Sequence, residues 1–259
     1  MAKRKRTTTE NTIARRLQQG RGQGNGASYR PWVTVQDVPS QGLTHRVKGW
    51  TTGRVHHLLS NLERDVFYVL DWSEAVLDIR EQYPLLPLAE TQALAQAFGI
   101  RHPADPRTHC PVVMSTDFLV DVRLENATVQ HARSVKPISQ LRARTLEKLE
   151  IERRYWQARG VDWGLVTEHD IPKCEANTIR LLHPYRDIEQ RLSGEYSLPQ
   201  IAGLLRANEH RLPVSEWVVI VDEQLGLTAG TARTVLYHLL ATRQMVCNLS
   251  LPLEKQVLA

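Results

Sequence analysis

The sequence of 259 residues is poor in cysteine and has no long apolar run, and both shortages restrict what the protein can be. The three cysteines lie far apart and form no Cys-x-x-Cys pair, which argues against a zinc ribbon or a disulfide framework. No apolar stretch is long enough to span a membrane, and none follows the basic N-terminus as in a signal peptide. We therefore expect a cytoplasmic globular protein with one large domain or two small ones.

Several common catalytic patterns are also missing. The glycine-rich stretch "GRGQGNG", residues 20–26, lacks the Lys-Ser/Thr pair of a phosphate-binding loop and is predicted to be a flexible loop. His56 and His57 are neighbours and cannot share one helix face, as a metal-binding pair would. No Ser-His-Asp or Cys-His arrangement stands out.

Positive charge is concentrated at the N-terminus. Residues 1–30 hold eight Lys or Arg and one acid, a net charge of +7, so the rest of the chain carries about −2 of the overall +5. This pattern predicts a basic arm that binds a polyanion, and a solvated, disordered tail is the alternative.

The periodicity of residues 53–167 predicts a mixed α/β unit. The expected elements are an amphipathic helix over 53–70, a strand over 76–82, a helix over 88–100, a strand hairpin over 115–137, a helix over 141–160 and a buried strand over 161–168. From about residue 172 the pattern is mostly helical, with helix-turn-helix spacing and a strand-like end over 216–253. Arg233, His238 and Arg243 could face DNA there, and a bundle that docks another protein is an equal alternative.

Charged residues interrupt the alternation of the predicted hairpin. Asp117 lies on its first strand and Lys136 at the end of its second. If both side chains point the same way, they converge near a sheet edge. Glu63 could reach the same place from the preceding helix, and Glu152 from the following one.

Such a set suits the hydrolysis of a phosphodiester by Mg²⁺, which prefers one or two carboxylates together with water and phosphate. Asp117 would be the central ligand, Glu63 would flank it, and the main-chain carbonyl of Ser134 or Val135 could complete the shell. Lys136 would orient the attacking water and stabilise negative charge. The Asp and Ser-x-Lys spacing is that of the PD-(D/E)xK fold, although a surface salt bridge gives the same pattern.

Longer stretches resemble one family. The segments "TGRVHHLLSNLE", "VLDIREQYPLLP", "VMSTDFLVD", "VKP" and "TLEKLEIERRYW" are similar to TnsA, the endonuclease subunit of heteromeric cut-and-paste bacterial transposases. The similarity is strong from about residue 12 to about residue 170 and fades beyond. It implies a basic arm over 1–30, a restriction-endonuclease-like PD-(D/E)xK catalytic domain over 31–171 and a smaller, helical, winged-helix-like domain over 172–259.

The resemblance also implies roles for single residues. Glu63, Asp117 and Lys136 form the implied catalytic set, with Mg²⁺ as the cofactor and Mn²⁺ as a substitute. Ser134 stands where the family commonly has glutamine, and a ligand supplied by its main-chain carbonyl would survive that difference. Glu152 and, less directly, Glu81 would support the site, whereas Asp121 is expected to be structural.

The implied task is to cut the 5′ ends of a transposon in bacterial cytoplasm, while a DDE-type transposase (TnsB-like) cuts and joins the 3′ ends. The C-terminal domain would contact an AAA+ regulator (TnsC-like), which makes protein docking the better interpretation of its helix-turn-helix spacing. The residues expected to contact DNA phosphates are Lys3, Arg4, Lys5, Arg6, Arg15, Arg16, Arg21, Arg46, Lys48 and Arg54.

Two alternatives remain open from the sequence. One is a free-standing restriction or repair nuclease with the same site, which would cut DNA without partners. The other is a non-catalytic DNA-binding adaptor, in which Asp117 could be replaced without loss of function.

Overall fold

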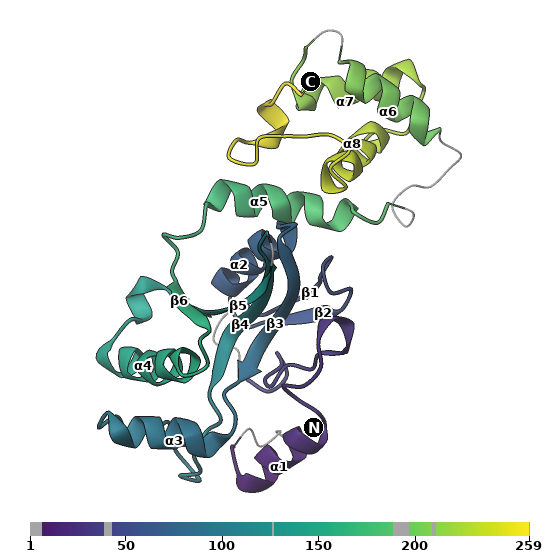
Figure 1. Ribbon diagram of the computed structural model, residues 1–259. Coiled ribbons are helices and arrows are strands. Elements are labelled where there is room, and N and C mark those ends of the chain that lie inside the picture. Colours follow the sequence, from purple (N-terminus) through teal and green to yellow (C-terminus); the bar gives the residue numbers. More distant parts are fainter. Residues whose placement is uncertain (1–6, 39–42, 126, 189–196, 209–210, 259) are drawn as a thin grey trace. The chain divides into compact units, whose positions relative to one another are not determined.

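The chain divides into two compact units, Met1–Ile171 and Pro172–Ala259. The computed structural model describes residues 7–38, 43–125, 127–188, 197–208 and 211–258 (Figure 1). The first unit is mixed α/β, as predicted, and the described part of the second is helical. None of the described helices combines the length and the apolar character that crossing a bilayer requires.

A mixed sheet of four strands forms the centre of the first unit. Its spatial order is β3 (Val76–Pro84), β4 (Ser115–Arg123), β5 (Thr128–Val135) and β6 (Asp162–Val166). The β4–β5 hairpin is antiparallel, as predicted, and β6 runs parallel to β5. The prediction that β6 is buried was wrong: it lies at the edge of the sheet, where its residues are only half-buried or exposed.

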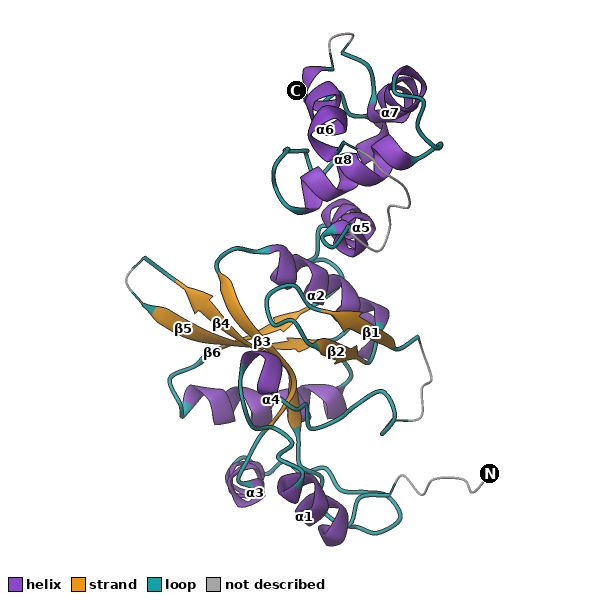
Figure 2. Ribbon diagram, turned by 90° about the vertical axis from the view of Figure 1, so that its right-hand side faces the viewer, coloured by secondary structure: helices purple, strands orange, loops and turns teal. Residues whose placement is uncertain are grey.

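Helices cover both faces of this sheet (Figure 2). The helix α4 (Ala143–Gln157) packs Tyr155 and Trp156 against Leu119 and Ala132 of the sheet. The helix α2 (Asn61–Trp72) lies on the other face, and α3 (Leu88–Ala97) lies beside α4. The active-site candidates on β4 and β5 therefore lie between two helical layers.

The predicted helix over 53–70 begins only at Asn61. Residues Val55–Leu58 instead form β2, which pairs with β1 (His45–Lys48) in a separate two-stranded sheet. His56 and Leu58 are buried whereas Val55 and His57 are not, an alternation with the period of a strand. The sequence of residues 55–58 is thus compatible with both the helical spacing and the alternation of a strand. Pairing with β1 selects the strand.

The described part of the predicted basic arm is folded onto the sheet. After α1 (Glu10–Gln18), the Gly22 backbone lies so close to Pro84 that a Cβ there would come within 2.2 Å of the Pro84 Cγ. Tyr29 and Trp32 are buried, and the Trp32 N–H donates to the Gln82 carbonyl at 3.1 Å. Residues 7–30, including the predicted flexible loop, therefore belong to the first unit and are not a separate appendage.

The second unit contains α5 (Lys173–Leu182), α6 (Leu198–Ala207), α7 (Val214–Gln224) and α8 (Thr231–Ala241). Asp222 fixes the predicted turn between α7 and α8 by accepting from the Gly230 and Ala232 N–H groups at 2.7 Å each. The short 3₁₀ helices of the chain are η1 (Gly26–Ser28), η2 (Ile138–Gln140), η3 (His183–Tyr185) and η4 (Leu253–Lys255).

The predicted strand-like end after α8 is not a strand, and the described residues of the second unit form no wing. The Gln256 side chain takes the place of a neighbouring strand, accepting from the Asn248 N–H at 2.9 Å and donating to the Asn248 carbonyl at 2.8 Å. Pro252, which lacks an N–H, lies between them and disfavours a regular ladder.

Candidate active site

Glu63 is held at the first turn of α2 and is only 5% exposed. Ser60 caps the helix by accepting from the Glu63 N–H at 3.1 Å, and the Ser60 hydroxyl donates to Glu63 Oε1 at 3.2 Å. The Leu59 N–H donates to Glu63 Oε2 at 2.9 Å. The N-cap bond from Ser60 and the two bonds to the carboxylate thus hold Glu63 at the N-terminus of the helix.

Asp117 and Lys136 meet at the open end of the β4–β5 hairpin, opposite its turn. The Lys136 ammonium donates to Asp117 Oδ2 at 2.7 Å and to the Val135 carbonyl at 2.9 Å. The Val135 N–H donates to the same Asp117 oxygen at 2.7 Å. Lys136 itself follows the end of β5, and its N–H is fixed by the Val166 carbonyl of β6 at 3.0 Å. The predicted convergence of the aspartate and the lysine is confirmed.

The single positive charge of Lys136 does not neutralise the carboxylates of both Glu63 and Asp117. Burial, followed by the nearby charge of Asp117, raises the pKa of Glu63 to about 7. Burial lowers the pKa of Lys136, but the charges of Asp117 and Glu63 outweigh it and raise that pKa above its usual value. One ammonium therefore faces two acidic side chains in a poorly solvated place, and a divalent cation would remove the imbalance.

Gln82 joins the two acidic side chains and was not recognised in the sequence. Its Nε2 lies 3.3 Å from Asp117 Oδ1 and 3.4 Å from Glu63 Oε2. The Ser115 hydroxyl donates to its Oε1 at 3.1 Å. No sequence pattern indicated this role, because Gln82 marked only the end of a predicted strand.

Glu152 lies on the α4 side of the sheet, where three donors share its Oε1. The Thr116 hydroxyl donates at 2.8 Å, the Trp163 indole N–H donates at 3.1 Å, and the Ser134 hydroxyl also donates. Burial raises the pKa of Glu152 to about 6, in opposition to these hydrogen bonds. Ser134 therefore directs its side chain to Glu152, whereas the Lys136 side chain reaches Asp117.

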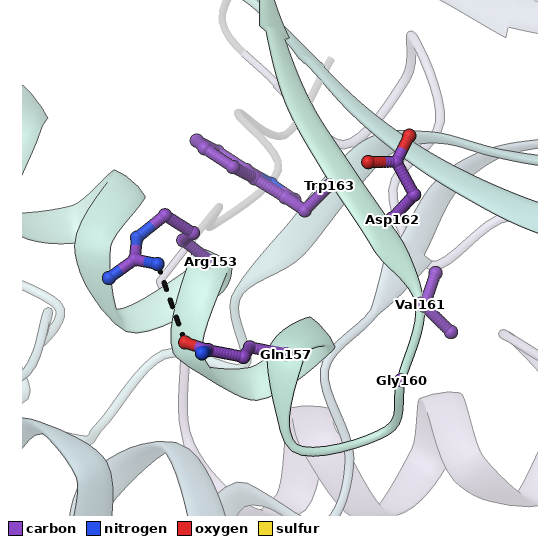
Figure 3. Close-up of a pocket in the computed structure, with 6 residues that line it drawn as sticks. All are labelled: Arg153, Gln157, Gly160, Val161, Asp162 and Trp163. Atoms are coloured by element: carbon purple, nitrogen blue, oxygen red, sulfur yellow. Dashed lines mark hydrogen bonds between the residues drawn. The ribbon is translucent and has the colours of Figure 1, made fainter.

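A surface pocket of about 380 Å³ adjoins this cluster (Figure 3). Trp163 of β6 lines it together with Arg153 and Gln157 of α4, and the Arg153 Nη1 donates to Gln157 Oε1 at 3.4 Å. None of Glu63, Asp117 and Lys136 lines the pocket, so it is separate from the carboxylate pair.

Glu81, predicted as a supporting residue, belongs to another cluster. Arg54 donates to both of its carboxylate oxygens, at 2.8 Å for Oε1, and His56 Nδ1 donates to Oε2 at 2.8 Å. The His57 N–H donates to Oε1 at 3.1 Å. Burial alone raises the pKa of Glu81, but the bonds from Arg54 and His56 outweigh it and hold that pKa at about 2. Its carboxylate is fully engaged with β2 and the loop before it.

The basic residues predicted to contact DNA fall into three groups. Lys3, Arg4, Lys5 and Arg6 lie outside the described residues. Arg15, Arg46 and Lys48 are exposed, the last two on the same face of β1. Arg16, Arg21 and Arg54 are engaged inside the protein.

The engaged arginines pair with acids of the first unit. Arg21 donates to Asp37 at 2.6 Å, and Arg16 lies 3.7 Å from the same carboxylate and 5.4 Å from the centre of the Trp32 ring. Arg54, 8% exposed, is bound to Glu81. The prediction that Arg54 contacts phosphate therefore conflicts with its burial. Of the helix-turn-helix candidates, His238 donates from Nδ1 to the Tyr185 carbonyl at 2.9 Å and faces inward.

The donor set fits a hard cation such as Mg²⁺. Glu63, Asp117 and the Val135 carbonyl supply oxygen atoms only, and one or two carboxylates are what Mg²⁺ usually takes from a protein. Over the described ranges, no group of three His, Cys, Asp or Glu side chains forms a complete metal cage. A cation here would need water or phosphate oxygens to complete its shell, which is the requirement of a metal that acts on a phosphodiester.

Comparisons with known proteins agree with the resemblance seen in the sequence. Residues 73–168 match the family described as TnsA-like endonuclease N terminal, and residues 170–249 match the family described as TnsA endonuclease C terminal. The transposon Tn7 transposition protein TnsA of Escherichia coli is 44% identical over 239 residues, which cover 91% of this chain and 86% of that protein. Because this identity extends over both units, the chain belongs to the TnsA endonuclease family.

Proposed function

We propose that this protein is a Mg²⁺-dependent endonuclease that hydrolyses a phosphodiester at each 5′ end of a transposon during cut-and-paste transposition. The observation that carries the proposal is the convergence of Glu63, Asp117 and Lys136 in a member of the TnsA family. A mixed sheet with a carboxylate and a lysine on adjacent strands, and a helix that adds a second carboxylate, also supports a PD-(D/E)xK arrangement.

In this proposal Glu63, Asp117 and the Val135 carbonyl hold the metal, and Mn²⁺ can replace Mg²⁺. The bound metal supplies Lewis-acid polarisation of the phosphoryl oxygens and a water of lowered pKa. Lys136, held 2.7 Å from Asp117, keeps a fixed ammonium beside the place where the scissile phosphate gains negative charge. Water adds to phosphorus, one P–O ester bond breaks, and the leaving oxygen gains a proton.

Glu152 supports this site from the other face of the sheet. Its side chain binds Thr116 and Ser134, the residues that directly precede Asp117 and Val135 in the chain. These bonds therefore hold in place the two strands that carry the contact between the Val135 N–H and Asp117. The Ser134 side chain thereby binds Glu152 and not the metal. The next residue, Val135, supplies the carbonyl that is proposed as a metal ligand. This accounts for a serine at a position where the family commonly has glutamine.

The exposed basic residues would bind transposon-end DNA through its phosphates, from Arg15, Arg46 and Lys48 and from the basic residues before position 7. The second unit would contact an AAA+ regulator, and a DDE-type transposase would cut and join the 3′ ends. Exposed apolar residues on that unit, Val246, Leu251 and Val257, at 79%, 51% and 52% exposure, support a protein partner there. The helical α7–α8 pair without a strand wing is also suited to protein contact.

Transposition reconstituted with the partner subunits tests the proposal by comparing wild type with Asp117→Ala. We expect 5′-strand cleavage to fall by about 10³-fold or more, because the metal loses its central ligand and Lys136 loses its partner. Cleavage and joining of the 3′ strand should persist. The matched control is Asp121→Ala on the same strand, which removes a carboxylate paired with Arg80 and should leave 5′ cleavage within about threefold of wild type.

Two results would contradict the proposal. Unchanged 5′ cleavage by the Asp117→Ala protein would favour a DNA-binding adaptor whose partner cuts. Efficient cutting of unrelated DNA by the wild-type protein without partners would favour a free-standing restriction or repair nuclease.

A further inference from the structure

Gln82 occupies the space between the two carboxylates that the proposed function assigns to the metal. Its side-chain nitrogen lies 3.3 Å from Asp117 Oδ1 and 3.4 Å from Glu63 Oε2. The residue is 3% exposed, so solvent does not compete for these contacts. An amide nitrogen has two hydrogens, and here each carboxylate can receive one of them.

The chemistry of its neighbours fixes which end of the amide faces the carboxylates. Glu63 Oε2 already accepts from the Leu59 N–H, and a carboxylate oxygen without a proton only accepts hydrogen bonds, so the NH₂ group faces Glu63 and Asp117. The opposite end faces the Ser115 hydroxyl, which donates to Oε1 at 3.1 Å. The Gln82 backbone is held as well, because its carbonyl accepts from the Trp32 N–H at 3.1 Å.

The backbone of Gln82 adopts a conformation that a side chain normally avoids. Its φ is +49°, in the left-handed region that favours glycine, so this placement is energetically unfavourable for a residue with a side chain. Gln82 lies between Glu81 and Tyr83, whose partners on β4 are Phe118 and Thr116, the residues on either side of Asp117. A residue kept in a disfavoured conformation beside the candidate site indicates that its side chain is needed in that place.

The preceding residue makes this conformation rigid. Glu81 is 0% exposed and is bound by Arg54, His56 and the His57 N–H. The Tyr29 hydroxyl also donates to the Glu81 carbonyl at 3.1 Å. The chain therefore enters Gln82 from a clamped residue, and the amide cannot easily leave the carboxylates.

We propose that Gln82 is a positioning residue for the metal: its amide holds the facing oxygens of Glu63 and Asp117 in the arrangement that binds one divalent cation. The inference rests on the proposed function. Without the amide, two carboxylates share one lysine, which pairs with the far oxygen of Asp117, and their repulsion favours rotation of Glu63 away from Asp117. With the amide, both side chains are preorganised, and each facing oxygen keeps a lone pair for the cation.

The test is Mn²⁺ titration of the full-length protein by calorimetry, without DNA, for wild type and Gln82→Met. Methionine keeps the length and volume of the side chain but cannot donate. We expect the Mn²⁺ dissociation constant to rise about tenfold or more, as when other groups that orient metal ligands are removed. The matched control is Gln130→Met, since Gln130 lies exposed on β5 and donates to Asp121 at 3.0 Å; its dissociation constant should equal that of wild type.

Cleavage in the reconstituted reaction gives a second measurement. The Mn²⁺ concentration for half-maximal 5′ cleavage should rise with the dissociation constant, whereas the rate at saturating Mn²⁺ should return to within about threefold of wild type. A purely structural defect would lower the saturated rate and would not be rescued by metal. Ser115→Ala, which frees only the far end of the amide, should weaken Mn²⁺ binding by roughly threefold and covers the case that Gln82→Met fails to fold.

The outcomes separate this inference from the proposed function. Equal or tighter Mn²⁺ binding by Gln82→Met overturns the inference, because the amide would then be neutral or a competitor of the cation. If Gln82→Met does not fold, unchanged binding by Ser115→Ala has the same meaning. Absence of Mn²⁺ binding by the wild-type protein overturns the proposed metal site together with this inference.

Discussion

Two buried acidic clusters meet at Glu81 and Gln82 of β3, and they balance their charges differently. Glu81 is bound by Arg54, His56 and a backbone N–H, and its pKa is held at about 2. Glu63 shares one lysine with Asp117, and burial together with Asp117 raises its pKa to about 7. A buried carboxylate whose donors satisfy it acts as a structural anchor, whereas an undercompensated pair is prepared for a cation.

Gln82 lies between the two clusters and joins them. It follows the clamped Glu81 in the chain, and its amide spans the undercompensated pair. The first cluster thus supplies the rigidity that the second needs. Replacement by glutamine should therefore affect cleavage at Glu63 and stability at Glu81.

The largest expected effect is on cleavage by Glu63→Gln. We expect 5′ cleavage in the reconstituted reaction to fall by about 10³-fold, because a neutral amide is a poor ligand for the proposed metal. The free energy of unfolding without metal should not fall, since glutamine can still accept from Leu59 and Ser60 and no longer repels Asp117. A large loss of stability would show that Glu63, like Glu81, is a structural carboxylate, and the proposed difference between the two clusters would be wrong.

The next effect is on stability, for Glu81→Gln. Removal of one partner leaves the guanidinium of Arg54 buried without its counter-ion, so denaturant unfolding should show a loss of about 3 kcal/mol. The control is Asp121→Asn, whose ion pair with Arg80 is partly exposed, and it should cost less than about 1 kcal/mol. Equal losses of unfolding free energy in the two variants would mean that the buried Glu81 cluster stabilises the protein no more than a partly exposed ion pair does.

The smallest effect is the pH dependence of the stability differences between wild type and the two variants. It is measured as the free energy of unfolding in the presence of a chelator, which removes metal ions. Glu81 has a folded pKa of about 2, below its ordinary 4.5, so its stabilisation is complete above pH 4.5 and is lost as the pH falls through 2. Glu63 has a raised pKa, so its ionisation costs stability as the pH rises from 4.5 through about 7.

Wild type should accordingly lose most of its advantage over Glu81→Gln on acidification to about pH 3, roughly 2 of the roughly 3 kcal/mol that the pKa shift is worth. Glu63→Gln should gain on wild type by a similar amount as the pH rises from 4.5 to above 7. Parallel pH profiles for the two variants would contradict the difference between the clusters.

Local sequence patterns were sufficient to predict much of the site. The hairpin over 115–137 follows from its alternation, and the helix over 141–160 from its apolar spacing, so the convergence of Asp117 with Lys136 could be predicted. Glu63 was placed on the correct helix, although that helix begins at Asn61 and residues 55–58 form a strand. That boundary depended on pairing with β1, which no local pattern encodes.

What the sequence by itself determined is therefore the mixed α/β class, the hairpin that brings Asp117 to Lys136, and membership of the TnsA family. The class and the hairpin follow from the short-range periodicity of apolar residues, and family membership follows from short sequence motifs. The tertiary structure alone decided that Glu81 is a satisfied anchor, that Ser134 serves Glu152, that residues 7–30 pack on the sheet, and that Gln82 bridges two carboxylates. The physical reason is that charge compensation is a property of groups distant in sequence: Arg54, Glu63, Gln82 and Asp117 acquire their functions only when folding removes water and places them within hydrogen-bonding distance.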